Sequence, residues 1–146
     1  MVYGPPMQAF HSLDQLNESV DELWKFFDGK AKEVPFTTFL AFIDVRDLLS
    51  AYLRVASPTN EKANNQHYLA VGGRYSFDEA DVIVQEAFPE QAARMTPSDG
   101  KPAPEYYKTD ASKTEADFGI KWTPFKKTVV DSADAIFKAE AQFASA

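Results

Sequence analysis

Helix-start signals constrain the fold of this chain more than any other feature of its sequence. Ser12, Ser76 and Ser112 each stand three residues before a glutamine or a glutamate. This spacing defines a capping box, in which two side chains satisfy backbone N–H groups at the first turn of a helix. Apolar residues recur at intervals of three and four after these signals. The sequence therefore favours a fold in which amphipathic helices are separated by short apolar runs.

The ends of the expected helices are marked as clearly as their starts. Gly29 and Gly119 follow the last apolar position of two of them, and a proline follows two others closely. Pro124 suits the first position of the last helix. The expected helices run from Ser12 to Phe27, from Asp44 or Asp47 to Ala56, from Ser76 to Ala87, from Ser112 to Phe118, and from Thr123 to at least Phe137.

Two apolar runs between these helices are short and β-prone. Phe36 to Val45 and His67 to Val71 are expected to be strands. The small sheet is expected to include Phe39 to Val45 and Tyr68 to Val71. Three phenylalanines in the first run, at positions 36, 39 and 42, are expected in the core rather than around a ligand pocket. Thr96 to Pro104 is expected to be an exposed loop. The pattern predicts an α+β fold with helices packed on a small sheet.

Composition narrows the functions that such a domain can have. The 146 residues suffice for a single domain with a single core. The net charge of −7 and the scattered basic residues argue against nucleic acid or an anionic membrane as a partner. Without cysteine, and with only His11 and His67 as imidazoles, no metal site is predicted. The absence of a signal sequence and of a long apolar stretch favours a cytoplasmic protein.

Sequence motifs for catalysis are missing. The six glycines never fall in the G-x-G-x-x-G spacing that lets a backbone approach a pyrophosphate. None of the six tyrosines is followed four residues later by lysine, so no Tyr-x-x-x-Lys pair shares a helix face. No nucleophile elbow, P-loop or zinc-protease motif occurs either. We therefore assign no catalytic residue within this chain.

Two local groups have both a functional and a structural interpretation. His11 with Asp14 is a possible general base and orienting acid, but an exposed histidine beside a helix start is the favoured interpretation. Arg46 is a possible anchor for a substrate carbonyl or phosphate. The favoured interpretation is a strand-to-helix corner, in which Asp44 or Asp47 caps the helix and Arg46 forms a local ion pair.

Six stretches of the chain occur in the same order in one known family. The chain resembles the C-terminal part of an extended short-chain dehydrogenase/reductase of the epimerase/dehydratase superfamily, close to NADPH-dependent carbonyl and methylglyoxal reductases and dihydroflavonol reductases. The stretches that carry the resemblance are Val2 to Pro6, Ser12 to Ser19, Phe42 to Leu48, His67 to Val71, Phe77 to Pro89, and Asp110 to Phe125.

The resemblance implies a division of labour within the family. There, the nucleotide-binding half and the catalytic serine, tyrosine and lysine precede a tyrosine-glycine-proline corner, and this chain begins at that corner. Residues 1–146 would then be the substrate-binding lobe of a Rossmann-type reductase, with NADP as the cofactor of the whole enzyme but not bound by this chain alone. The implied cofactor contacts are Tyr3, Gly4 and Pro5. The implied substrate contacts are Gln8, Phe10, His11 and Asn17, and Ser19 is implied to border the same region.

Three functions remain open from the sequence. The first is a truncated or separately encoded substrate-binding lobe of an NADP-dependent oxidoreductase for ketones or aldehydes, inactive alone, for which a nucleotide-binding half in trans is one possible partner. The second is a stand-alone module that binds a small molecule or a partner through an apolar surface. The third is a small dehydratase or isomerase with His11 or His67 as its base.

Overall fold

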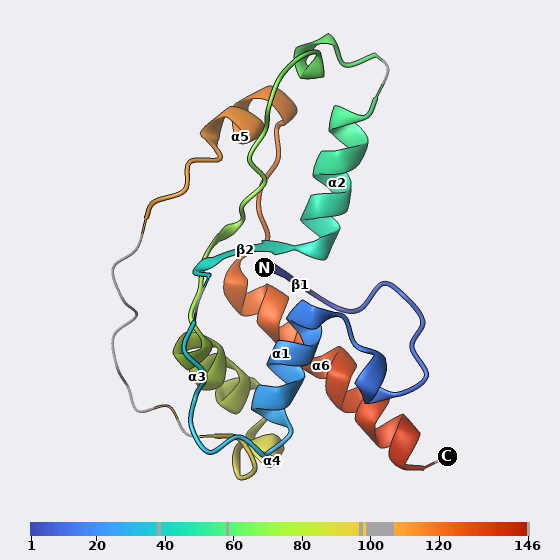
Figure 1. Cartoon of the computed structure of the whole chain (residues 1–146), viewed down its shortest axis with the longest axis vertical. Helices are drawn as coiled ribbons and strands as arrows, with labels where there is room; N and C mark the ends of the chain where they lie inside the picture. Colours follow the sequence, from blue (N-terminus) through green and yellow to red (C-terminus); the bar gives the residue numbers. More distant parts are fainter. Residues whose placement is uncertain (38, 58, 97, 99–106, 146) are drawn as a thin grey trace.

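The computed structural model describes residues 1–37, 39–57, 59–96, 98 and 107–145. Most of the predicted loop from Thr96 to Pro104 lies outside these residues. The described chain is mainly helical, with short strands at its centre (Figure 1). In chain order the elements are β1 (Val2–Tyr3), the 3-10 turn η1 (Leu13–Gln15), α1 (Glu18–Phe27), β2 (Ala41–Asp44), α2 (Val45–Val55), the 3-10 turn η2 (Glu61–Ala63), β3 (Gly73–Arg74), α3 (Phe77–Ala87), α4 (Pro89–Ala92), α5 (Ser112–Phe118) and α6 (Phe125–Ala144).

The sheet has β2 at its centre and β1 and β3 at its edges. β1 is parallel to β2, with Val2 opposite Ile43, whereas β3 is antiparallel to β2. Because parallel strands point the same way, the carboxyl ends of β1 and β2 lie at the same edge of the sheet. That edge is where the chain turns into the segment after Tyr3 and into α2.

Two apolar clusters hold the molecule together. The larger joins α1, α3 and α6 to the sheet, and its fully buried side chains include Leu23, Phe26, Val84 and Ile136. The smaller is built on Ala51, Phe118 and Ile120. Figure 1 shows the corresponding elongated shape, with α2 and α5 at one end and α1, α3, α4 and α6 at the other. Burial of apolar area at about 25 cal/mol per Å² makes the larger cluster the main source of stability.

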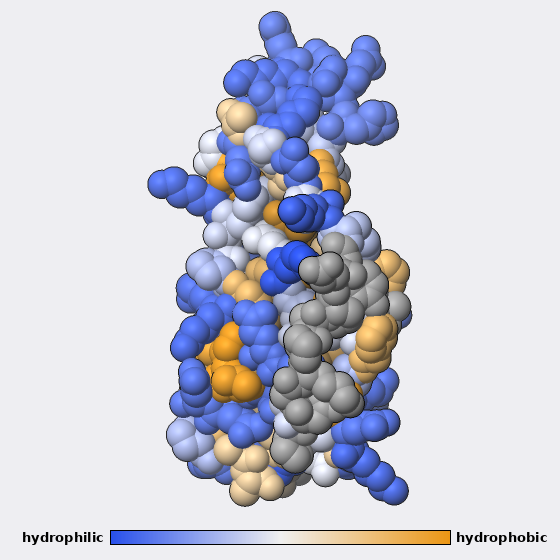
Figure 2. Space-filling view, turned by 90° about the vertical axis from the view of Figure 1, so that its left-hand side faces the viewer, coloured by the Kyte–Doolittle hydropathy of each residue, from blue (hydrophilic) through white to orange (hydrophobic). Residues whose placement is uncertain are grey.

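Hydrophilic and apolar residues are unevenly distributed over the outer surface. On the face that Figure 2 shows, hydrophilic residues cover the tip of the end that carries α2 and α5, while apolar patches lie below this tip and over the other end. Among the described helices, none combines the length and the apolar character needed to cross a lipid bilayer.

Two of the predicted helix starts are confirmed by their hydrogen bonds. The Ser76 hydroxyl accepts a hydrogen bond of 3.1 Å from the backbone N–H of Glu79 at the start of α3. The Asp44 carboxylate accepts one of 2.9 Å from the N–H of Arg46 at the start of α2. Gly119 ends α5 with a φ of +62°, as its position after the last apolar residue predicts.

Replacing Ser76 with alanine is expected to lower the free energy of unfolding by about 0.5–2 kcal/mol, because an N–H group in the first turn of α3 loses its acceptor. Urea denaturation followed by circular dichroism measures the change. Ser12→Ala is the matched control, because the Ser12 side chain makes no capping hydrogen bond, and a change within about 0.5 kcal/mol is expected for it. Equal losses in the two variants would contradict this assignment of the caps.

The other predicted starts are displaced. Ser12 precedes only the turn η1, because the extended backbone at Leu16 interrupts the helix, and Asn17 caps α1 instead through a bond of 3.1 Å from the N–H of Val20. Ala111, not Ser112, flanks α5. α6 likewise begins at Phe125, one residue after Pro124.

The predicted strand from Tyr68 to Val71 is wrong. β2 contains only Ala41–Asp44 before the chain enters α2, and β3 already occupies its free edge, so no edge of β2 remains for this run. The run instead lies against α5, where the Thr114 hydroxyl donates a 2.7 Å hydrogen bond to the Leu69 carbonyl. The Tyr68 ring also packs on Phe118, with 4.5 Å between the ring centroids.

The prediction that three phenylalanines lie in the core is wrong for two of them. Phe42 is buried in the larger cluster, but Phe36 and Phe39 are 69% and 59% exposed. Both precede β2, so no strand pairing turns their side chains inward. They line a surface hollow together with Tyr75 and Phe77.

Candidate functional site

The corner after β1 is held in a conformation that requires glycine. Gly4 has a φ of +121°, and a Cβ atom at this position would lie 2.8 Å from Val45 Cγ1 and 3.2 Å from Asp44 Oδ1. Its N–H donates a 2.9 Å hydrogen bond to the hydroxyl of Ser132, a buried residue of α6. Ser132 in turn donates to the Thr128 carbonyl at 2.8 Å. The corner is therefore fixed against both α6 and the start of α2.

A buried carboxylate anchors the neighbouring end of β2. Asp44 has no exposed surface and accepts hydrogen bonds from the Arg46 guanidinium at 2.8 and 2.7 Å and from the Thr128 hydroxyl at 2.8 Å. Burial disfavours the charged carboxylate, but these bonds outweigh it and hold the pKa of Asp44 below its ordinary value. Arg46 also bonds Asp131 at 2.6 Å. The structural interpretation of Arg46 is thus the one its contacts support.

A pocket of about 260 Å³ opens beside this corner. It lies at the carboxyl ends of β1 and β2, which is where open α/β sheets bind their ligands. The corner forms one wall, the first turn of α1 another, and the first residue of α2 closes the end. Its lining residues are Val2, Tyr3, Gly4, Pro5, Pro6, Met7, Asn17, Glu18, Ser19, Val20 and Val45.

The first turn of α1 brings hydrogen-bond donors to the pocket. The first N–H groups of a helix have no partner within it, and they carry the positive end of the helix dipole. Asn17 satisfies the N–H of Val20, whereas no hydrogen bond from the described residues reaches the N–H groups of Glu18 and Ser19, two residues that line the pocket. This arrangement suits an oxygen with negative charge, such as a carbonyl or phosphate oxygen. The neighbouring prolines and valines supply an apolar wall.

The hydroxyl of Tyr3 points away from this chemistry. It donates a 2.8 Å hydrogen bond to the Tyr75 hydroxyl, and the two rings meet edge to face with 5.1 Å between their centroids. Burial raises the pKa of Tyr3 far above its ordinary value and that of Tyr75 to about 12. Neither phenol is tuned to release a proton near neutral pH. Tyr3 therefore forms part of the pocket wall but does not act as an acid.

The structure brings together some of the residues that the sequence singled out and separates others. Tyr3, Gly4, Pro5 and Asn17 converge on the pocket, whereas three proposed substrate contacts do not line it. Gln8 is exposed. The Phe10 ring packs edge to face on Phe143, with 5.8 Å between the ring centroids. His11 is exposed, and its backbone N–H donates a 3.0 Å hydrogen bond to Gln15 Oε1.

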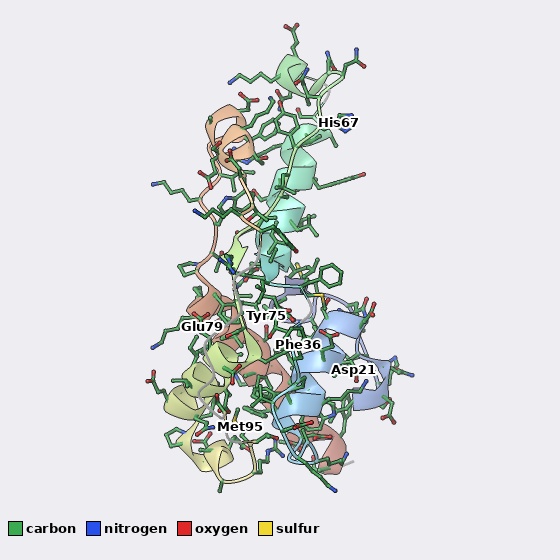
Figure 3. The ribbon with its side chains drawn as sticks, turned by 60° about the vertical axis from the view of Figure 1, so that its left-hand side comes forward. Asp21, Phe36, His67, Tyr75, Glu79 and Met95 are labelled. Atoms are coloured by element: carbon green, nitrogen blue, oxygen red, sulfur yellow. The ribbon has the colours of Figure 1, made fainter. Side chains whose placement is uncertain are left out.

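The imidazoles offer no second site. His11 and Asp14 are both exposed, and His67 lies at the end of the molecule that carries α2 and α5 (Figure 3). Within the described residues, no group of three or more histidine or acidic side chains is placed to hold a metal ion. The pocket beside Gly4 is therefore the candidate site.

Comparison with known proteins defines the class to which this fold corresponds. The arrangement is that of the C-terminal portion of Rossmann-type reductases. It superposes on yeast methylglyoxal/isovaleraldehyde reductase Gre2 in complex with NADPH with a TM-score of 0.70, at 23% identity over 96% of this chain and 45% of that one. Gre2 of Candida albicans in complex with NADPH gives a TM-score of 0.68, at 24% identity over 94% and 41% of the two chains.

Relatives found by sequence agree with this fold. Two uncharacterised oxidoreductases of Schizosaccharomyces pombe match almost the whole chain. One is 26% identical over 94% of this chain, and the other is 28% identical over 97% of it. No protein-family model matches the chain. The chain spans about 40% of the length of these relatives. The predicted resemblance to the C-terminal part of an extended short-chain dehydrogenase/reductase is therefore confirmed, and the homologues of this chain are oxidoreductases.

Some pocket residues escaped the sequence analysis. Pro6, Met7, Val20 and Val45 carry no chemical motif, because they act by shape alone. Val45 was within reach of prediction, since it follows a strand whose carboxyl end meets that of β1. Ser19, by contrast, was placed beside the substrate by the family resemblance, together with Asn17, and it does line the pocket.

Proposed function

We propose that this chain is the substrate-binding part of an NADPH-dependent reductase of ketones or aldehydes. The observation that carries the proposal is the pocket between the Gly4 corner and the first turn of α1, at the carboxyl edge of the sheet. The similarity of the fold to Gre2 structures with bound NADPH supports it. In such an enzyme NADPH supplies the hydride.

The pocket residues have roles that this chemistry needs. The N–H groups of Glu18 and Ser19 would hold a carbonyl oxygen of the substrate or the polar edge of the nicotinamide. Pro5, Pro6 and Val45 would exclude water from one face of the site. Gly4, which also lines the pocket, lets the corner lie close to Val45 and Asp44.

A second part is needed to complete the reaction. A pocket of about 260 Å³ is below the roughly 300–1,000 Å³ that small-molecule sites occupy, and a dinucleotide is larger than most such ligands. No glycine of the chain has the spacing that cradles a pyrophosphate. The Tyr3 hydroxyl is bound to Tyr75 and is not free to protonate an alkoxide. We expect a nucleotide-binding part to supply the phosphate site and the proton donor.

The purified chain alone is expected to show no NADPH-dependent reduction of a ketone or aldehyde above a heat-treated control, and at most very weak NADPH binding. The reason is that hydride transfer needs both reactants held about 3–3.5 Å apart by one site. Absorbance at 340 nm and NADPH fluorescence titration measure the two quantities. Turnover by the chain alone would overturn the proposal. Micromolar binding of a carbonyl compound without NADPH would favour a stand-alone binding module.

A further inference from the structure

One charged residue borders the pocket of the candidate site. Among the described residues that line the pocket, Glu18 alone carries a charge at neutral pH, because the buried Tyr3 phenol keeps its proton and the others have no ionisable side chain. Glu18 is exposed in the first turn of α1. The pocket therefore combines an apolar wall and backbone N–H donors with a single carboxylate.

No basic side chain neutralises this carboxylate. Within the part of the chain that the structure describes, no lysine or arginine forms an ion pair with Glu18. Lys25, the only basic residue of α1, is paired with Asp21. Arg46, in the first turn of α2, is paired with Asp44 at 2.7 Å. Neither cation is therefore free to offset the charge of Glu18.

The charge of Glu18 acts on its surroundings. The Glu22 carboxyl lies one turn further along α1, and its pKa is raised by burial and by the negative charge of Glu18. A second negative group brought into the pocket would be repelled in the same way, whereas a positive group would be attracted. Because Glu18 is exposed, solvent limits both effects to a few-fold change in affinity.

We propose that Glu18 sets the charge selectivity of the pocket, which favours a carbonyl compound with an ammonium group over a similar compound with a carboxylate. This inference rests on the proposed function, in which the N–H groups of Glu18 and Ser19 hold the carbonyl oxygen. That oxygen has only a partial negative charge, so the pocket accepts it beside a carboxylate that repels a fully charged oxyanion. The ammonium group of the compound would pair with the Glu18 side chain.

The test is a titration of the purified chain with three ketones of similar size, followed by the amide chemical shifts of Asn17 to Val20. The probes are para-(aminomethyl)acetophenone, para-acetylbenzamide and para-acetylbenzoate, which at pH 7 are cationic, neutral and anionic. In low salt the wild-type chain is expected to bind the cationic ketone about fivefold more tightly than the anionic one, with the neutral ketone between them. Sodium chloride at about 0.5 M should bring this ratio close to one. Millimolar dissociation constants suffice, because only their ratio is compared.

Substitutions at Glu18 test the source of the selectivity. Glu18→Gln is expected to bring the three dissociation constants within about twofold of one another, and Glu18→Lys to reverse their order. Glu90→Gln is the matched control, because it changes the net charge by the same amount, but Glu90 belongs to α4 and does not line the pocket. This variant should keep the wild-type order.

The possible outcomes separate this inference from the proposed function. Equal binding of the three ketones by the wild type, or an order that survives in Glu18→Gln, overturns the inference and leaves a pocket that binds carbonyl compounds. Loss of the order in Glu90→Gln also overturns it, because the total charge of the chain would then be the cause. If none of the ketones shifts these amides at any soluble concentration, the result counts against the proposed function as well.

Discussion

Asp44→Ala is expected to lower the free energy of unfolding by about 3 kcal/mol. The change removes the cap of α2 and leaves the Thr128 hydroxyl and part of the Arg46 guanidinium without their acceptor. Breaking a buried ion pair costs about 3–5 kcal/mol. We expect the lower end, because the Arg46 side chain is 35% exposed and retains Asp131. Urea denaturation at pH 7 measures the loss.

Asp131→Ala is the matched control, since it removes the other, more exposed partner of Arg46 and is expected to cost less than about 1 kcal/mol. The pH dependence gives a second check. The pKa of Asp44 is lowered in the folded state, so its stabilisation is complete above the ordinary value of 3.8 and is lost as the pH falls through the folded value. The difference between wild type and Asp44→Ala should therefore be constant from pH 7 to 5 and shrink below pH 4. A difference that grows on acidification would contradict this role.

Gly4→Ala is expected to lower the free energy of unfolding by about 2–4 kcal/mol and to disturb the pocket. A φ of +121° costs a residue with a side chain about 1–3 kcal/mol. The added methyl group would also lie 2.8 Å from Val45 Cγ1, and relieving such overpacking typically costs about 1–3 kcal/mol. Thermal unfolding gives the stability, and amide chemical shifts of Asn17 to Val20 report the pocket wall.

Gly119→Ala separates strain from crowding. Gly119 also has a positive φ, +62°, but no atom lies within 4 Å of the position its Cβ would take. We therefore expect only the backbone cost of about 1–2 kcal/mol and no shift of the pocket amides. If Gly4→Ala were no more damaging than Gly119→Ala, the close approach of the corner to Val45 would not matter for the fold.

Local chemistry made the helices predictable. The Ser76 cap, the Asp44 cap and the Gly119 stop each involve residues within four positions of one another, so the sequence contains the whole interaction. Ser12 shows the limit of that reasoning. Its capping box has the correct spacing, but the extended backbone at Leu16 ends the turn, and Asn17 starts the helix that packs.

The strand predicted from Phe39 to Val45 contains β2, whereas the one predicted from Tyr68 to Val71 is wrong, because pairing depends on distant residues. His67 to Val71 has a strand-like composition, yet only Gly73–Arg74 finds an edge of β2. Phe36 and Phe39 are as apolar as Phe42, but only Phe42 lies within the paired strand. The sequence of such an apolar segment does not show whether the edges of β2 are already paired with other strands.

The sequence predicted the pocket residues that belong to the family resemblance, but not those that line the pocket by shape alone. The corner from Tyr3 to Pro5 belongs to the family resemblance, and Asn17 was part of the same pattern. The lining by Val45 and Met7 depends on the path of the chain after each strand. Phe10 was proposed as a substrate contact because of its position near the corner, but Phe143 of α6 offers it a partner.

The two apolar clusters bear on how the molecule opens. Three buried residues, Ala51, Phe118 and Ile120, form the smaller one, whereas the larger includes sixteen buried residues. Thermal fluctuations that separate α5 from α2 therefore disrupt far less apolar contact than global unfolding does. Such a partly opened form would keep the Gly4 corner intact, because the Gly4 N–H is bound to Ser132 of α6, a helix that packs in the larger cluster. Sub-global unfolding of one end is thus compatible with a continuously formed pocket.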